Sequence, residues 1–291
     1  VEMEWSEPVP LLNAGLYWPG VLRGDLGDVC SHWTEGNPVA GITFYRALIQ
    51  AGNTEPIDAC VKALLDRSIN PLPIYVQSLK DPVSGGVISA NFEKIAPDII
   101  INATGFAVSK PGAERTTSPF DTASCPVLQI VFAASTKEHW TTNVSGLIAR
   151  DIAMNVALPE VDGRVLSRAV AFKSEAAFDS ATETSVVKHM PAEDRVKFVV
   201  DLAAGWVKLR RKSVSDRRIA LILANYPNRD GRIGNGVGLD TPAGTINLLR
   251  AMITAGYDVV DQPKTGKELI DRLLAGPTNA AQSTREIKEK I

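Results

Sequence analysis

Short apolar runs alternate with segments of helical spacing over the first half of the chain. The apolar residues between positions 57 and 65 recur at intervals of three and four, which indicates the buried face of a helix. A second helix is expected over residues 83–95, although Gly85 and Gly86 weaken it. The runs between these helices are short and continuous, as in buried strands. The expected strands cover residues 41–46, 72–76, 98–102 and 126–132.

The same alternation continues towards the C-terminus with longer helices. Strands that alternate with helices are typical of parallel βαβ units, which have right-handed crossovers. The further expected elements are a helix over residues 144–156 that ends before Pro159, a strand over 164–172, an amphipathic helix over 192–209, a strand-loop-helix-strand unit from Arg217 to about Val260, and a last helix from Lys267.

These patterns predict an α/β protein. We expect a parallel βαβ-type sheet domain over residues 39–163, a strand plus an amphipathic linking helix over 164–215, and the start of a second α/β domain over 216–291. Residues 1–38 are rich in proline, glycine and tryptophan and lack periodicity, so we expect an extended arm or connector. The second α/β unit is too short to close a sheet. We therefore expect a truncated domain, in an internal piece of a longer protein.

Composition limits the possible classes of function. The chain has 31 basic and 33 acidic side chains, which argues against a nucleic-acid-binding protein. No run of 18 apolar residues is present, and the N-terminus has no signal-peptide pattern, so we expect no membrane span. Three scattered cysteines without a C-x-x-C motif make a structural zinc site an unfavourable interpretation. A reducing cytoplasm is the default location for such a chain.

A long polar connection runs from Asn225 to Pro242, between an apolar run and an amphipathic segment. Such a connection leaves the carboxyl end of a strand, where ligands bind in open α/β sheets. Its glycines do not follow the G-x-x-x-x-G-K-[ST] pattern, so phosphate binding is a weak interpretation. A mobile, ligand-gripping loop is more natural, with Arg229 and Arg232 as partners of carboxylates. An exposed flexible linker is the alternative.

Two short segments carry candidate acids and bases. Glu138 and His139 follow the strand expected to end at residue 132, and they can serve as proton acceptors or metal ligands. A solvated first helical turn is the alternative. Glu160 and Asp162 stand two residues apart after a helix, so both carboxylates could face one site and attract a divalent cation. A plain surface turn contains the same residues.

Two further positions suit ligand contacts. Asn102 and Thr104 are polar residues at the end of a buried strand, hence at the carboxyl edge of the sheet, although a simple strand-ending turn explains them equally well. Trp140, beside His139, is the tryptophan that we retain as a possible wall for a flat ligand.

Several long motifs resemble the large subunits of the CobN/magnesium chelatase family. The resemblance runs from about residue 10 over nearly the whole chain, and the residues of these motifs favour the cobalt member of the family. The segments that carry it are 44–48 (Phe-Tyr-Arg-Ala-Leu), 70–73, 78–82, 102–107 (Asn-Ala-Thr-Gly-Phe-Ala), 149–163 and 223–242. Large subunits of this family exceed a thousand residues, so the resemblance implies that this chain is an internal portion.

The resemblance implies insertion of a metal into a tetrapyrrole. The cobalt member's large subunit is thought to bind hydrogenobyrinic acid a,c-diamide and Co²⁺, while partner subunits of the AAA+ type hydrolyse ATP. This agrees with the lack of a Walker motif here. Metal insertion needs bases for two pyrrole protons and ligands that strip water from the ion and later release it. By motif membership, the acid/base candidates are Glu138, His139, Glu160 and Asp162, and the first three are also the metal-ligand candidates.

The same reasoning assigns the rim of the macrocycle. Its carboxylates and amides need arginines and polar donors, for which Asn225, Arg229, Arg232 and Asn235 are the candidates, together with Asn102 and Thr104. Three other interpretations remain open. The chain could be a scaffold that docks the motor subunits and the remaining segments of the large subunit, without an active site of its own. It could belong to a magnesium-type large subunit, or be a periplasmic-type small-molecule binder, which the missing signal peptide disfavours.

Overall fold

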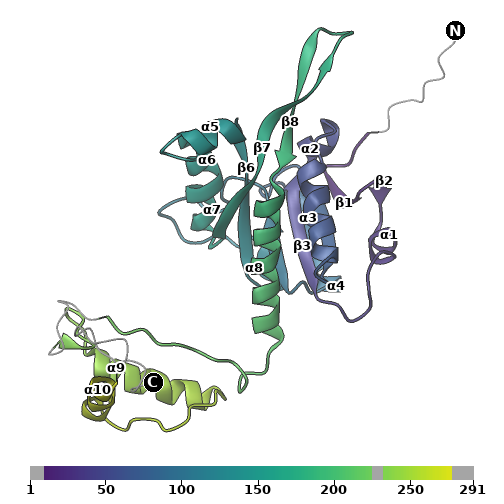
Figure 1. Cartoon of the computed structure of the whole chain (residues 1–291). Coiled ribbons are helices and arrows are strands. Elements are labelled where there is room, and N and C mark those ends of the chain that lie inside the picture. Colours follow the sequence, from purple (N-terminus) through teal and green to yellow (C-terminus); the bar gives the residue numbers. More distant parts are fainter. Residues whose placement is uncertain (1–9, 225–231, 277–291) are drawn as a thin grey trace. The chain divides into compact units, whose positions relative to one another are not determined.

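The computed structural model describes residues 10–224 and 232–276, and contacts within the chain divide it into two compact units, residues 1–210 and 211–291 (Figure 1). The elements of the first unit are β1 (Ala14–Trp18), β2 (Val21–Gly24), α1 (Leu26–Cys30), β3 (Val39–Tyr45), α2 (Arg46–Gln50), α3 (Glu55–Leu65), β4 (Asn70–Val76), α4 (Pro82–Lys94), β5 (Ile99–Asn102), the 3₁₀ turn η1 (Pro119–Ala123), β6 (Val127–Thr136), α5 (Lys137–Thr142), α6 (Ala149–Ile152), the π-helical turn η2 (Ala153–Ala157), α7 (Leu158–Val161), β7 (Val165–Asp179), β8 (Thr184–Pro191) and α8 (Glu193–Arg211). In the second unit the helices are α9 (Thr241–Thr254) and α10 (Gly266–Ala275).

One eight-stranded sheet organises the first unit, in the order β2-β1-β4-β3-β5-β6-β7-β8. The strands β4, β3, β5, β6 and β7 are parallel, whereas β1 and β8 pair antiparallel at either side of this group. The α/β class predicted from the sequence is thus confirmed. Every residue of β4 and β5 is buried, as expected for central strands covered on both faces.

The helices cover both faces because the chain reverses direction across the sheet. β4 lies on one side of β3 and β5 lies on the other, so two right-handed crossovers place α3 and α4 on opposite faces. In Figure 1, α3 and α8 lie side by side, and residues of both helices line a common groove. Four buried residues of α3, at helical spacing, join the core: Ile57, Cys60, Val61 and Leu64.

The N-terminal segment differs from the expected extended arm. Residues 14–30 form β1, β2 and α1, and β1 extends the sheet by pairing with β4. Tyr17 and Trp18 of β1 are buried in the main core, and the Tyr17 hydroxyl donates to the Asp58 carboxylate of α3 at 2.6 Å. Tyr17 and Trp18 therefore belong to the core of the first unit.

Two other expectations from the sequence were wrong. The helix expected over residues 144–156 begins only at Ala149, passes through a π-helical turn and continues past Pro159, which occupies the first turn of α7. Val144, which we placed on its buried stripe, is fully exposed. The two strands of the unit expected from Arg217 to about Val260 are also absent: residues 217–224 and 257–263 form no strand, and Ile222 is 94% exposed.

Among the residues that the structure describes, no helix is both long and apolar enough to cross a membrane.

Candidate functional site

The topological switch point of the sheet lies between β3 and β5. β3 connects to β4 on one side of it, whereas β5 lies on the other side and connects to β6. The loops that follow β3 and β5 therefore run to opposite faces of the sheet. In doubly wound folds with this order of parallel strands, ligands bind in that crevice. Asn102 is the last residue of β5, and Thr104 follows in the loop, so both candidate residues lie at the switch point.

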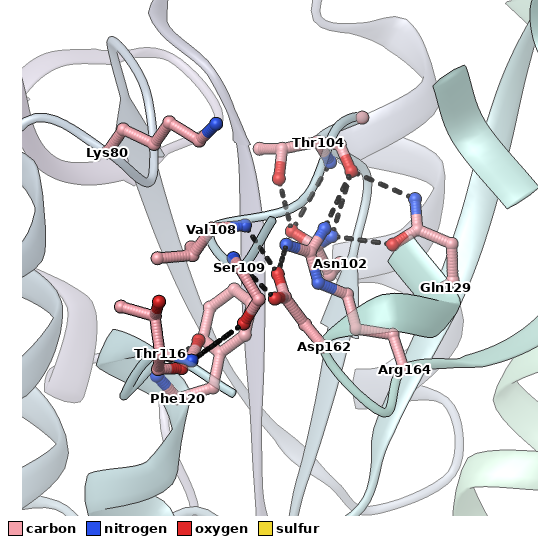
Figure 2. Close-up of polar contacts among 12 residues, drawn as sticks. Lys80, Asn102, Thr104, Val108, Ser109, Thr116, Phe120, Gln129, Asp162 and Arg164 are labelled. Atoms are coloured by element: carbon pink, nitrogen blue, oxygen red, sulfur yellow. Dashed lines mark hydrogen bonds and ion pairs between the residues drawn. The ribbon is translucent and has the colours of Figure 1, made fainter. Parts of the chain in front are cut away.

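A buried network of side-chain hydrogen bonds occupies this position. The Asn102 side-chain oxygen accepts from the Thr43 hydroxyl at 2.7 Å and from the Thr104 hydroxyl at 2.9 Å. The Asn102 amide donates to Gln129 Oε1 at 2.7 Å and to the Thr104 carbonyl at 3.0 Å. Figure 2 shows the side chains of Asn102, Thr104 and Gln129 converging. Since Asn102 and Thr104 are 0% exposed and their polar atoms are engaged, the side chains hold the loop in place rather than presenting themselves to a ligand.

A buried ion pair fastens the same loop from the other side. Asp162, in the turn after α7, accepts from the backbone amides of Val108 and Ser109 at 2.7 and 2.9 Å and pairs with Arg164 at 2.6 Å. Burial alone raises the pKa of the Asp162 carboxyl, but these hydrogen bonds and the Arg164 charge outweigh it, so the pKa is lowered. Both side chains of the pair are 1% exposed. This geometry favours a structural role for Asp162.

The remaining acid/base candidates are solvent-accessible, unlike Asp162. Glu138 and His139 are exposed in the first turn of α5, which the Thr136 hydroxyl caps by accepting from the His139 amide at 3.2 Å. Glu160 is exposed on α7, whereas Asp162 points into the interior. Within the described ranges, no group of three or more His, Cys, Asp or Glu side chains is placed to hold a metal ion.

The candidates of the glycine-rich loop fall partly outside the described residues, where Asn225 and Arg229 lie. Arg232 and Asn235 are described in the second unit, and the Asn235 amide donates to the Arg232 carbonyl at 3.0 Å. Gly234 has a positive φ of 67°, as a turn at this position requires. These two candidates thus share one tight turn before α9.

Trp140 packs rather than forming a wall for a ligand. Its ring lies 5.2 Å from that of Phe172, and the Arg195 guanidinium stands over it at 4.5 Å. Both partners belong to the interior side of β7 and α8, so the indole closes a small apolar cluster at the end of β6.

The structure draws attention to residues that sequence reasoning passed over. Phe106 has a positive φ of 62° and a half-exposed ring directly beyond the network. Asp151 is 2% exposed and accepts from the Ala134 amide at 2.8 Å. Both lie within motifs that carried the family resemblance, at residues 102–107 and 149–163. Their place in these motifs was the signal that the sequence offered. A bulky aromatic residue and an acidic residue within a helix are, however, ordinarily taken as a packing position and a surface position.

A cleft of about 410 Å³ opens beside the same loop, between the start of α4 and residues 108–119. Lys80, Asp81, Val108 and Thr117 are among its lining residues. Lys80 is exposed, and Figure 2 shows its ammonium group directed towards the loop that carries Thr104 and Val108. The switch point therefore has a closed, hydrogen-bonded floor and an open cleft with a cation at its margin.

Comparison with known proteins agrees with the motifs. A family model described as CobN/Magnesium Chelatase matches residues 1–291. An aerobic cobaltochelatase subunit CobN from Sinorhizobium sp is 51% identical over 97% of this chain and 23% of its own length. A magnesium-chelatase subunit from Rhodobacter capsulatus is 25% identical over 98% of this chain and 25% of its own length.

A solved structure shares the fold. The catalytic subunit of cobaltochelatase from Mycobacterium tuberculosis matches with a TM-score of 0.72 and 29% identity, over 95% of this chain and 22% of that one. The chain thus spans about a quarter of the length of the relatives that it matches. Because the family model covers every residue and the fold agrees with that of a solved member, the chain belongs to the CobN/magnesium chelatase family.

Proposed function

We propose that this chain is part of the tetrapyrrole-binding large subunit of an ATP-dependent cobaltochelatase, which inserts Co²⁺ into hydrogenobyrinic acid a,c-diamide in the cytoplasm. The observation that carries the proposal is the difference in identity, 51% to a CobN subunit against 25% to a magnesium-chelatase subunit over nearly the same residues. ATP is hydrolysed by AAA+ partner subunits and is not bound here. The remaining segments of the large subunit complete the cavity.

The reaction exchanges inner N–H protons of the macrocycle for one metal ion. Each proton that leaves a ring nitrogen passes to a base, all four ring nitrogens bind Co²⁺, and the ion releases its water. Glu138 and His139 are exposed and adjacent, so they can accept protons and contact an incoming ion, at the cost of one long contact of 3.4 Å between His139 Nε2 and the Asn143 side-chain amide. The described structure does not bring Glu160 into one cluster with them, so Glu160 would join as a second carboxylate when the remaining segments complete the site. Such a set would bind Co²⁺ weakly and release it, as a delivered substrate requires.

The polar loops would grip the rim of the macrocycle. Arg232 and Asn235, with Asn225 and Arg229 outside the described residues, supply cationic and amide donors suited to carboxylates and amides. Asn102, Thr104 and Asp162 then contribute indirectly, by holding the 103–118 loop in position through the buried network and the ion pair. Their part in the reaction would be positioning.

A scaffold without an active site is the second candidate. It is favoured by the internal use of the Asn102, Thr104 and Asp162 side chains, and by the lack of a ready three-ligand cluster in the described part of the chain. In this case the chain docks the motor subunits and other parts of the large subunit. A magnesium-type activity would instead be recognised by exchanging the metal and the macrocycle in the same assay.

The two candidates are separated by substitution in the full-length large subunit, assayed with its partner subunits and ATP. Co²⁺ insertion is followed by the absorbance of the macrocycle, and macrocycle binding is measured in parallel. His139→Ala, Glu138→Gln and Glu160→Gln should each slow insertion by about tenfold or more while binding is retained, in line with the usual effect of losing a general base.

Glu93→Gln is the matched control, because Glu93 is equally exposed but lies near the end of α4, away from the carboxyl edge of the sheet. Unchanged insertion in all three variants, with the macrocycle still bound, would refute the catalytic assignment and leave the scaffold.

A further inference from the structure

Phe106 adopts a backbone conformation that bulky residues rarely take. Its φ is 62°, in the left-handed region, and its side chain is 47% exposed. A left-handed φ brings the β-carbon close to the carbonyl oxygen, so an aromatic residue there is strained unless the surroundings impose it. Strained positions of this kind concentrate at ligand contacts. Phe106 also stands directly beyond the switch point of the sheet.

Residues of two neighbouring elements, β3 and η2, hold the backbone in this conformation. The Gly105 carbonyl accepts from the Tyr45 hydroxyl at 3.2 Å, and the Phe106 amide donates to the Met154 carbonyl at 2.7 Å. Gly105 has no room for a side chain, because a β-carbon there would lie 2.6 Å from the Asn155 side-chain oxygen and 2.9 Å from the Met154 carbonyl. The loop is therefore clamped between β3 and η2, and the Phe106 side chain is left about half exposed.

The clamp itself is a second departure from regular structure. Met154 and Asn155 lie in the π-helical turn η2, and such turns are frequent at functional sites. The turn is anchored from below, because the buried Asp151 carboxylate accepts from the Ala134 amide of β6 and from the Asn155 amide at 3.5 Å. A widened helical turn and a strained aromatic residue thus meet at one point and fix the outward position of the ring.

The surroundings suit one end of a flat, acidic ligand. Two residues after Phe106, Val108 lines the cleft of about 410 Å³ that Lys80 also lines. An exposed aromatic face offers stacking to a planar conjugated ring, and an ammonium group at a cleft margin offers a charge partner to a carboxylate. The floor of this region is the closed Asn102 network, which a ligand cannot enter.

We propose that Phe106 stacks against the face of the tetrapyrrole and that Lys80 pairs with a carboxylate on its rim. The inference rests on the proposed function and adds to it a contact in the first unit, at the switch point of the sheet. It explains why a bulky, half-exposed aromatic residue occupies a position where glycine or asparagine would be unstrained. A turn that serves packing alone gives no reason for the exposed ring.

The test is titration of the full-length large subunit with hydrogenobyrinic acid a,c-diamide, followed by absorbance. Phe106→Asn tolerates the left-handed backbone but removes the ring, and should weaken binding about tenfold, while the melting temperature stays equal or rises. Phe106→Trp restores a ring and should bind within about threefold of wild type. Lys80→Gln should weaken binding about threefold and reduce its dependence on salt.

Phe178→Asn is the control, because Phe178 is a more exposed aromatic residue, 65%, on the β7–β8 hairpin, and its replacement should leave binding unchanged. Should Phe106→Asn lower the melting temperature, Phe106→Gly, which relieves the strain further, replaces it. Wild-type affinity in a stably folded Phe106→Asn subunit that still inserts Co²⁺ overturns this inference alone. Failure of the wild-type subunit to bind the macrocycle overturns the proposed function as well.

Discussion

The buried Asp162–Arg164 pair makes the sharpest prediction about stability. In Asp162→Ala, the Arg164 guanidinium, 1% exposed, loses its counter-ion, and the amides of Val108 and Ser109 lose their acceptor. Removing one partner of a buried pair typically costs about 3–5 kcal/mol. This is about a fifth or more of the free energy of unfolding of an ordinary domain, which is about 5–15 kcal/mol. With a slope of about 2 kcal/mol per molar urea, the unfolding midpoint should fall by about 1.5–2.5 M.

The assay is urea unfolding of the 291-residue chain, followed by tryptophan fluorescence and far-ultraviolet circular dichroism. Asp162→Leu combined with Arg164→Met replaces the pair by apolar side chains, and its cost should be smaller than the sum of the two single changes. Additive costs, or a loss below about 1 kcal/mol in Asp162→Ala with an unchanged slope, would refute the structural interpretation of this pair.

The same pair gives a dependence on pH. The pKa of Asp162 is lower in the folded chain than in the unfolded one, so its contribution is present above about pH 4 and is lost as the pH falls further. As the pH falls from about 5 through the ordinary aspartate pKa of about 4 and below it, the wild-type chain should therefore lose more stability than the apolar double variant does. Equal losses in the two proteins would contradict this assignment.

Two other predictions concern the same edge of the sheet. Gly105→Ala should destabilise the chain by about 1–3 kcal/mol in urea unfolding, because its β-carbon would press on the Met154 carbonyl. Gly86→Ala in α4, which has open space around it, is the control and should stabilise the chain by about 0.4–1 kcal/mol. Equal effects of the two changes would argue against the clamp at Gly105. His189 Nδ1 lies 3.1 Å from the side-chain amide nitrogen of Asn53, and burial, followed by the charge of Lys173, lowers the pKa of the imidazole. Because the unfolded chain then binds the proton more readily, the melting temperature should fall as the pH drops below about 6.5. His189→Gln should remove this part of the fall. An identical pH profile in the variant would refute the role of His189.

The sequence was sufficient for the parallel part of the sheet, because strands buried on both faces read as continuous apolar runs. β4 and β5 are of this type, and the α3 stripe from Ile57 to Leu64 follows a simple helical period. The family resemblance was confirmed over the whole chain. Long-range pairing was harder to foresee, since β1 contacts β4 across a large separation in sequence and carries no local signal of its partner.

The site was less predictable for a related reason. Spacing in the sequence placed Glu160 and Asp162 together, but one side chain is exposed and the other is fixed inside by Arg164. Hydrogen-bond partners 54 residues away, such as Val108, decide that outcome, and no local pattern reports them. Backbone strain at Phe106 is likewise invisible in a sequence, because its cause is a contact with Met154.

The amide network beneath the switch point has a consequence for how the molecule can move. Thr43, Asn102 and Gln129 belong to three neighbouring strands and join residues 59 and 27 positions apart in the chain. Sliding any of these strands by one residue would turn its polar side chain to the other face and leave buried partners unsatisfied. These hydrogen bonds therefore fix the register of the three strands relative to one another. Relative motion of these three strands would break buried hydrogen bonds, so segments outside the three strands can move at a lower cost.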